Sequence, residues 1–286
     1  MYFKLAWRNI WRNRTRTLIT VAAIFFAVIL STLMSSVKEG VYANMIDSMV
    51  GSFTGYGQIQ NINYQDEPII DNSLLFTDSL KSIIENEPGI KGFAPRLEGF
   101  ALTASDSVTK GAMIVGVDTE LEVAHTGMNE RVSGGDFLTA DDKGVLIGNG
   151  LAEYLKIGVG DTIIALGQGY HGSTAAGKYP IRGLVKFGSP DLSKRLVILP
   201  MKQAQLFFDV EDRYSNIVLL FEDDGESIEV VDHLKAKLAS EYAVMNWQEL
   251  IPDIVKMIEN EKVEGYIFMF ILYMVISFGI FGTVLM

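Results

Sequence analysis

Residues 172–179, GSTAAGKY, match the G-x-x-x-x-G-K spacing of loops that bind nucleotide phosphates. The match fails at Tyr179, because such loops carry there the Ser or Thr hydroxyl that ligates Mg²⁺. A phosphate loop also opens a helix, whereas Pro180 and the alternating sequence YPIRGLV predict a strand here. The pattern therefore predicts a glycine-rich hairpin over residues 167–180 rather than a nucleotide site.

Other residue types that carry catalysis or bind metals are sparse. The histidines are His125, His171 and His233, and none has a histidine or acidic partner at metal-ligand spacing. The chain has no cysteine, which excludes disulfides, thiolate ligands and a cysteine nucleophile. No spacing typical of a serine hydrolase, a zinc protease or an EF-hand occurs. We therefore expect no enzyme activity, no cofactor and no metal in this chain.

Charge is spread very unevenly over the 286 residues. Residues 1–16 hold five basic residues and no acidic one, whereas residues 38–265 hold the other 19 of the 24 basic residues and all 35 acidic ones. This distribution excludes a nucleic-acid-binding protein, because most of the chain would repel phosphates. The acidic segment is expected to stay in solvent and away from anionic lipid.

Two segments, Thr17–Val37 and Tyr266–Met286, contain no charged residue. A helix rises 1.5 Å per residue, so about 20 apolar residues cross the hydrocarbon core of a bilayer. Both segments are therefore predicted to be transmembrane helices, the second ending with the chain. The alternative for each is a buried helix of a soluble core, and for the first also a cleaved signal peptide.

The basic residues of the N-terminus predict an amphipathic helix in the lipid headgroup region over residues 1–16. Aromatic and apolar side chains follow helical spacing on one face, and cations lie on another. The expected membrane-interface residues are Lys4, Trp7, Arg8, Trp11, Arg12, Arg14 and Arg16. Basic residues beside a membrane helix favour the cytoplasmic side, so we expect a cytoplasmic N-terminus and an extracytoplasmic segment 38–265.

The large segment predicts a mixed α+β fold, so the chain is expected to be an α+β membrane protein. Strand and helix patterns in residues 38–129 and 213–246 form one α/β part. Residues 130–212 are richer in strand patterns and are predicted to be a β-rich insertion into it.

Both ends of this segment are predicted to continue the membrane helices. Val41, Met45, Ile46 and Met49 give residues 38–50 an apolar face, which is expected to line a groove or a dimer interface. Residues 247–265 predict a stalk helix that runs into the second span, and a helix of this kind can transmit movement across the membrane. Its candidate functional residues are Trp247, Glu249 and Leu250.

Three sequence motifs together resemble the FtsX-like permeases, and most closely the lipoprotein-releasing (Lol-type) and macrolide-export (MacB-type) ABC transporter permeases. The first is the run of Arg8, Asn9, Arg12, Asn13, Arg16 and Thr17. The second is VLIGNGLAEYLKIGVGDTIIAL at residues 145–166, and the third is WQEL at residues 247–250. Their order and the single span before a large external segment also fit these families.

The resemblance implies a permease of a mechanotransmitting transporter in the bacterial inner membrane, with a periplasmic α/β domain and a β-rich insertion. Its expected partners are a cytoplasmic ABC ATPase on a separate chain, which binds ATP and Mg²⁺, a second permease copy or paralogue, membrane lipids, and a periplasmic lipoprotein carrier or efflux adaptor. A hairpin of the insertion would dock the carrier. The candidate docking residues are Gly167, Tyr170, His171, Lys178, Tyr179 and Pro180.

The sequence departs from this family because it ends at Met286, before the expected third and fourth spans. It is therefore interpreted as the front part of a longer permease or as one of two chains. A two-span sensor with an extracytoplasmic ligand-binding domain is the main alternative, and a scaffolding anchor is a third.

Overall fold

The computed structural model describes residues 7–8, 11–12, 14–106 and 108–285. It divides into two units, of which each is treated by itself. The helical unit comprises Met1–Asn44 and Ile251–Met286, and the sheet unit comprises Met45–Leu250.

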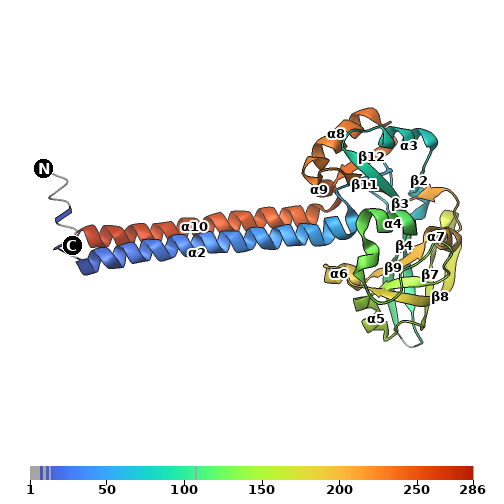
Figure 1. Ribbon diagram of the computed structural model, residues 1–286, viewed down its shortest axis with the longest axis horizontal. Helices are drawn as coiled ribbons and strands as arrows, with labels where there is room; N and C mark the ends of the chain where they lie inside the picture. Colours follow the sequence, from blue (N-terminus) through green and yellow to red (C-terminus); the bar gives the residue numbers. More distant parts are fainter. Residues whose placement is uncertain (1–6, 9–10, 13, 107, 286) are drawn as a thin grey trace. The chain divides into compact units, whose positions relative to one another are not determined.

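The helical unit is built from two long helices, α2 (Arg14–Ile46) and α10 (Pro252–Leu285), which lie side by side (Figure 1). They contain the two uncharged segments, and both are long and apolar enough to cross a membrane. Almost none of either apolar stretch is buried, and Leu18, Phe268 and Phe278 are more than half exposed. A core helix of a soluble protein buries such side chains, so the described residues do not fit that alternative.

The sheet unit contains one large sheet of ten strands. Nine strands follow each other in the order β12 (Tyr242–Asn246), β1 (Gly57–Asn61), β11 (Asn216–Phe221), β3 (Ile90–Ala104), β4 (Thr109–Val117), β9 (Leu196–Pro200), β6 (Val145–Gly148), β8 (Thr174–Val185) and β5 (Val132–Gly135). The tenth, β7 (Thr162–Gln168), pairs with both β3 and β8. Strands β3, β4, β9, β6, β8 and β7 therefore close into a ring. A separate two-stranded sheet pairs β2 (Leu74–Leu75) with β10 (Arg213–Tyr214).

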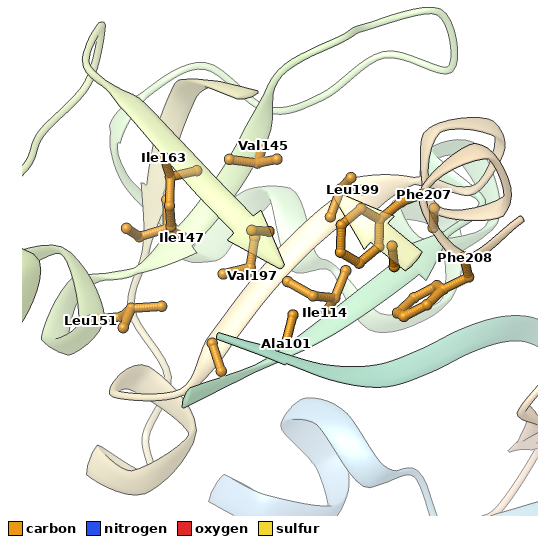
Figure 2. Packing of buried hydrophobic residues seen from close by; sticks show 14 of the residues in the cluster. Ala101, Ile114, Val145, Ile147, Leu151, Ile163, Val197, Leu199, Phe207 and Phe208 are labelled. Atoms are coloured by element: carbon orange, nitrogen blue, oxygen red, sulfur yellow. The ribbon is translucent and has the colours of Figure 1, made fainter. Parts of the chain in front are cut away.

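The ring of strands encloses the largest hydrophobic cluster, part of which is shown in Figure 2. Successive residues of β9 pack in two different hydrophobic clusters. Val197 belongs to the cluster inside the ring, whereas Ile198 belongs to a second cluster outside it. Both faces of β6 and β9 are thus covered, which explains why their sequences VLIG and LVILP are apolar throughout.

Short helices cover the faces of the sheet. These are α3 (Asp78–Glu85), α4 (Thr119–Thr126), α5 (Asn149–Leu155), α6 (Pro190–Ser193), α7 (Met201–Phe208), α8 (Ser227–Lys237) and α9 (Trp247–Leu250). Four 3₁₀ turns lie between them: η2 (Ile70–Asn72), η3 (Met128–Arg131), η4 (Tyr170–Gly172) and η5 (Asp224–Glu226). Helices α3 and α8 bury Leu80, Ile84 and Leu234 against β1, β11 and β12 in a third cluster.

One further helix, η1 (Asp47–Thr54), is a π-helix that follows α2 without a break. Its last hydrogen bond runs from the Gly55 amide to the Val50 carbonyl at 2.7 Å. Gly55 has φ of 78°, and a Cβ added to it would lie 2.4 Å from Cγ1 of Val218. Only glycine fits at this point. Gly55 is therefore the residue that ends the helix.

Thr77 precedes an apolar stripe in the sequence and is the N-cap of α3: its hydroxyl accepts a hydrogen bond from the Leu80 amide at 3.2 Å. The sequence patterns predicted neither helices α4 and α6 nor strands β2, β5 and β10. The expected β-rich insertion, residues 130–212, supplies four strands of the ring, while β3 and β4 lie in the expected α/β part. The two parts therefore share one continuous sheet.

The stalk helix expected over residues 247–265 is interrupted at Ile251, and its second part continues as α10 through the second apolar segment, as expected. Helix α9 ends at Leu250, and α10 begins at Pro252. Proline lacks an amide hydrogen to donate, and its ring disfavours the helical conformation of the residue before it, Ile251. Pro252 therefore starts a new helix at a position where proline is well tolerated.

Candidate functional site

The predicted docking hairpin forms: β7 and β8 pair antiparallel from Gln168 opposite Thr174 to Thr162 opposite Pro180. Lys178 lies within β8, so a strand and not a helix follows the glycine-rich segment, as YPIRGLV predicts. The tip does not stand free, because the His171 amide donates to Oδ1 of Asp71 at 2.6 Å. The tip is therefore fastened to η2.

The six predicted docking residues divide into two groups. Tyr170 and Tyr179 are half-buried against the cluster inside the ring, and the guanidinium of Arg213 lies 5.1 Å from the Tyr170 ring centre. His171, Lys178 and Pro180 are exposed, and Gly167 is half-buried. The structure thus offers only part of the predicted set to a partner. Docking itself stays a prediction.

An apolar surface that the sequence analysis missed lies beside this hairpin. The pairing of β3 with β7 sets Leu102 opposite Leu166 and Ala104 opposite Ile164. Leu102, Leu166 and Ile164 are about half exposed, and Phe100 on the same face of β3 is 65% exposed. The sequence feature that could have revealed this surface is that β7, TIIALGQ, does not alternate between apolar and polar residues.

A cavity of about 540 Å³ lies between α2 and α10 in the helical unit. On α2 it is lined by Ser31, Met34, Ser35, Lys38, Glu39 and Tyr42, and on α10 by Glu261, Lys262, Glu264, Gly265, Tyr266, Phe268 and Met269. The Tyr42 hydroxyl donates to Oε2 of Glu261 at 2.8 Å. This hydrogen bond joins the two helices at the charged end of the cavity.

The groove residues predicted from the sequence do not line this cavity. Val41 is 56% exposed, and Met45, Ile46 and Met49 are half-buried further along the chain. The cavity follows instead the helix positions 31, 34, 35, 38 and 42, which share one face of α2. A role of the four predicted residues in binding acyl chains or in dimer packing stays a prediction.

The most enclosed charged group of the sheet unit is Arg96 on β3, which is fully buried. Its Nε donates to Oε2 of Glu122 at 3.2 Å, and its Nη2 donates to the other oxygen of that carboxylate. Its Nη1 donates to the backbone carbonyl of Phe53, and the guanidinium lies 4.6 Å from the centre of the Phe53 ring. One side chain thus connects β3 with α4 and with η1.

Further polar groups surround this ion pair. Oε1 of Glu122 also accepts a hydrogen bond from the Thr126 hydroxyl at 2.9 Å. Glu98, two residues along β3, loses hydration, and this burial raises the pKa of its carboxyl; Asn216 and Arg96 oppose the rise. The sequence analysis missed the cluster because Glu122 belongs to an unexpected helix. A charged arginine within the strand pattern of residues 92–104 was the available signal.

The three predicted stalk residues lie in α9, whose first turn is held by a reciprocal cap. The Asn246 side chain accepts from the amides of Gln248 and Glu249, and the Glu249 carboxylate accepts from the Asn246 amide at 3.0 Å. The same carboxylate accepts from Nζ of Lys235 at 2.8 Å. Trp247 donates its amide to the Tyr56 carbonyl, and Leu250 is half-buried.

The predicted interfacial helix is described only in part. Trp7, Arg8, Trp11 and Arg12 are helical and exposed, and the two indole rings lie 6.4 Å apart. Arg14 and Arg16 lie in the first turn of α2, and Lys4 lies outside the described residues. Contact with lipid headgroups stays a prediction.

Within the described ranges, no group of three or more His, Asp or Glu side chains could hold a metal ion. His171 and His233 each lie near one carboxylate, that of Asp71 and that of Glu87. One carboxylate beside a histidine does not make a metal site.

Residues 17–237 match the family model of the MacB-like periplasmic core domain. The chain is 24% identical over 206 residues to the lipoprotein-releasing system transmembrane protein LolC of Xylella fastidiosa strain Temecula1, covering 69% of this chain and 48% of that protein. LolC of strain 9a5c matches with the same identity and coverage. The chain therefore spans about half the length of the curated relatives it matches.

Two solved structures are similar at low identity. The periplasmic region of MacB from Actinobacillus actinomycetemcomitans gives a TM-score of 0.46 at 16% identity, covering 73% of this chain and 95% of that one. The extracellular domain of the ABC-type transporter YknZ from Gram-positive bacteria gives 0.44 at 14% identity, covering 66% and 98%. Because the family model matches well over half of the chain, this protein belongs to the MacB-like periplasmic core domain family, and so to the FtsX/MacB-like ABC transporter permeases.

Proposed function

We propose that this chain is part of the permease of an ABC transporter that extracts lipidated substrates from the bacterial inner membrane. A cytoplasmic ATPase on a separate chain supplies the energy, and α2 and α10 carry movement to the sheet unit in the periplasm. Family membership and the two exposed apolar helices support this proposal.

The amphiphilic cavity between α2 and α10 is the observation that favours a lipidated substrate. Glu261 is hydrogen-bonded to Tyr42 at one end of the cavity, where Lys38 and Glu39 also lie. Met34 and Met269 line it further along the helices. A helix rises 1.5 Å per residue, so the apolar end lies about 12 Å from Tyr42 along α2. A cavity with a charged end and an apolar end fits a molecule with a polar head and an acyl chain.

The periplasmic end is expected to pass the substrate to a soluble carrier. The exposed apolar residues Phe100, Leu102, Ile164 and Leu166, together with His171 and Lys178 of the hairpin, form the surface proposed for that contact. An acyl-chain carrier has an apolar entrance, and an apolar surface of this kind would pack against it.

Photo-crosslinking in cells tests the proposal. A photoreactive residue replaces Met34 or Met269 in the cavity, and Leu30 or Phe270, both exposed and outside the cavity lining, serve as matched controls. We expect lipidated proteins to be captured from Met34 and Met269 and not from the controls. Capture of a second copy of this chain alone, or equal capture from all four positions, would contradict a lipidated substrate and favour dimer packing or efflux.

A further inference from the structure

The Arg96–Glu122 pair lies at the point where the chain enters the sheet. Both side chains are fully buried, so each charge has lost its hydration. A buried ion pair seldom adds more stability than well-packed apolar residues of the same volume. The third partner of Arg96, the Phe53 carbonyl, is the contact that an apolar replacement could not supply.

The Phe53 carbonyl belongs to the last turn of η1. Carbonyls at the C-terminal end of a helix have no partner within the helix, and cations there are favourable. Arg96 supplies a donor to the Phe53 carbonyl, and Nε2 of Gln58 supplies one to the Thr54 carbonyl at 2.7 Å. Side chains of the sheet thus bond the last carbonyls of this π-helix. π-Helices are rare in proteins, and those that occur are often found at functional sites.

Helix η1 packs into the sheet unit through the buried side chains of Val50 and Phe53, but a space remains beside it. A cavity of about 220 Å³ lies beside it, lined by Val50, Phe53, Thr126 and Val218 among others. Two of these residues belong to η1, and Thr126 is hydrogen-bonded to Glu122. The helix therefore borders a space next to the ion pair that holds its last turn.

We propose that Arg96 is a positioning residue that locks η1 to β3 and α4. With the lock closed, movement that arrives along α2 displaces the sheet as a whole. Without it, η1 would repack into the neighbouring cavity and absorb the movement. The source of the movement rests on the proposed function, whereas the lock is a property of the sheet unit alone.

Hydrogen exchange of the full chain in lipid nanodiscs, with no ATPase present, tests the lock. The double variant Arg96→Met, Glu122→Gln removes both charges together and leaves the Phe53 carbonyl without its donor. We expect exchange of the amides in residues 50–55 to rise at least about tenfold, because a hydrogen bond to a charged group is lost. Exchange in β9 is expected to stay unchanged.

Two further variants separate a lock from general stabilisation. Arg182→Met is the matched control, because Arg182, whose side chain is more than half exposed, donates through Nε to Asp142. It should leave η1 unchanged. Arg96→Lys keeps the charge opposite Glu122 but cannot form the three-way fork, and it should raise exchange in η1 by less than the double variant. If the double variant does not fold, hydrogen exchange of the Arg96→Lys variant tests the lock instead.

Wild-type protection of η1 in a folded Arg96 variant would overturn the proposal, as would an equal loss of protection in η1 and β9. The proposed function can fail separately. If η1 loosens as expected but no lipidated protein is captured from Met34 or Met269, the lock stands and the substrate assignment falls.

Discussion

The two segments that connect the sheet unit to the long helices are held in opposite ways. Helix η1, which enters the unit, buries Val50 completely and Phe53 almost completely, and its end is bonded to the buried Arg96. Helix α9, which leaves the unit, has no buried residue and is held by the cap of Asn246 and by an exposed ion pair between Lys235 and Glu249.

The difference has an energetic consequence. Breaking a buried, hydrogen-bonded ion pair leaves an unpaired charge without water, whereas exposed ion pairs contribute at most about 1 kcal/mol. Helix η1, the entry segment, is also continuous with α2, whereas Ile251 separates α9, the exit segment, from the start of α10 at Pro252. We infer that the entry segment is rigidly joined to the sheet and that the exit segment can bend.

Replacing Arg96 with alanine should give the largest effect. It leaves the Glu122 carboxylate buried and unpaired, so we expect a loss of about 3–5 kcal/mol in the free energy of unfolding. Urea unfolding in detergent micelles, followed by Trp247 fluorescence in a Trp7→Phe, Trp11→Phe background, measures it. Arg182→Ala should cost less than the Arg96 variant, about 1 kcal/mol, because the Arg182 side chain is more than half exposed and water replaces it beside Asp142. Equal losses in the two variants would contradict the difference between buried and exposed contacts.

Glu98→Gln tests the electrostatics of the same cluster through pH. Burial raises the pKa of the Glu98 carboxyl above its ordinary value of 4.5, so the folded state binds a proton that the unfolded state releases. The wild type should therefore lose stability as pH rises from the ordinary pKa through the raised one. The glutamine variant should be more stable than wild type at neutral pH and lack this loss. Glu153→Gln, an exposed position on α5, is the control, and identical pH profiles for Glu98→Gln and wild type would refute the prediction.

Local sequence patterns predicted the fold wherever one pattern sufficed. Thr77 before an apolar stripe indicated the start of α3, and the apolar runs at β6, β9 and β11 indicated strands; that both faces of these strands are buried is a finding of the structure. The closed ring could not be predicted from these patterns, because it depends on the pairing of β3 with β7, which lie about sixty residues apart in the sequence. Periodicity describes one element at a time and carries no information about such partners.

The candidate site was predictable only in part, for a similar reason. The hairpin was visible in its glycines and its alternation, but the hydrogen bond from His171 to Asp71 spans 100 residues. The pairing of Arg96 with Glu122 could not be predicted once α4 had been missed. The break at Ile251 was within reach, because Pro252 disfavours a helical residue before it and N-W-Q-E is a capping pattern.

Removing the cap of α9 should have a moderate effect. Asn246→Ala leaves the amides of Gln248 and Glu249 without their acceptor, and we expect a loss of about 1 kcal/mol in the free energy of unfolding. Glu249→Gln is the matched variant, because glutamine can still accept from the Asn246 amide but loses the ion pair with Lys235. It should cost less than about 1 kcal/mol. A larger loss for Glu249→Gln than for Asn246→Ala would show that the surface ion pair, and not the cap, holds the exit.

Pro252→Ala should have the smallest effect on stability and the clearest effect on local structure. Alanine restores an amide hydrogen and frees Ile251 to become helical, so α9 and α10 can join into one helix. We expect slower hydrogen exchange over residues 248–256, with little change in the free energy of unfolding. Pro190→Ala is the control, since Pro190 starts α6 after the extended residue Ser189 and no helix precedes it. Unchanged exchange over residues 248–256 would mean that the break at Ile251 is imposed by the cap of α9 rather than by the proline, and the exit would then be stiffer than its sequence suggests.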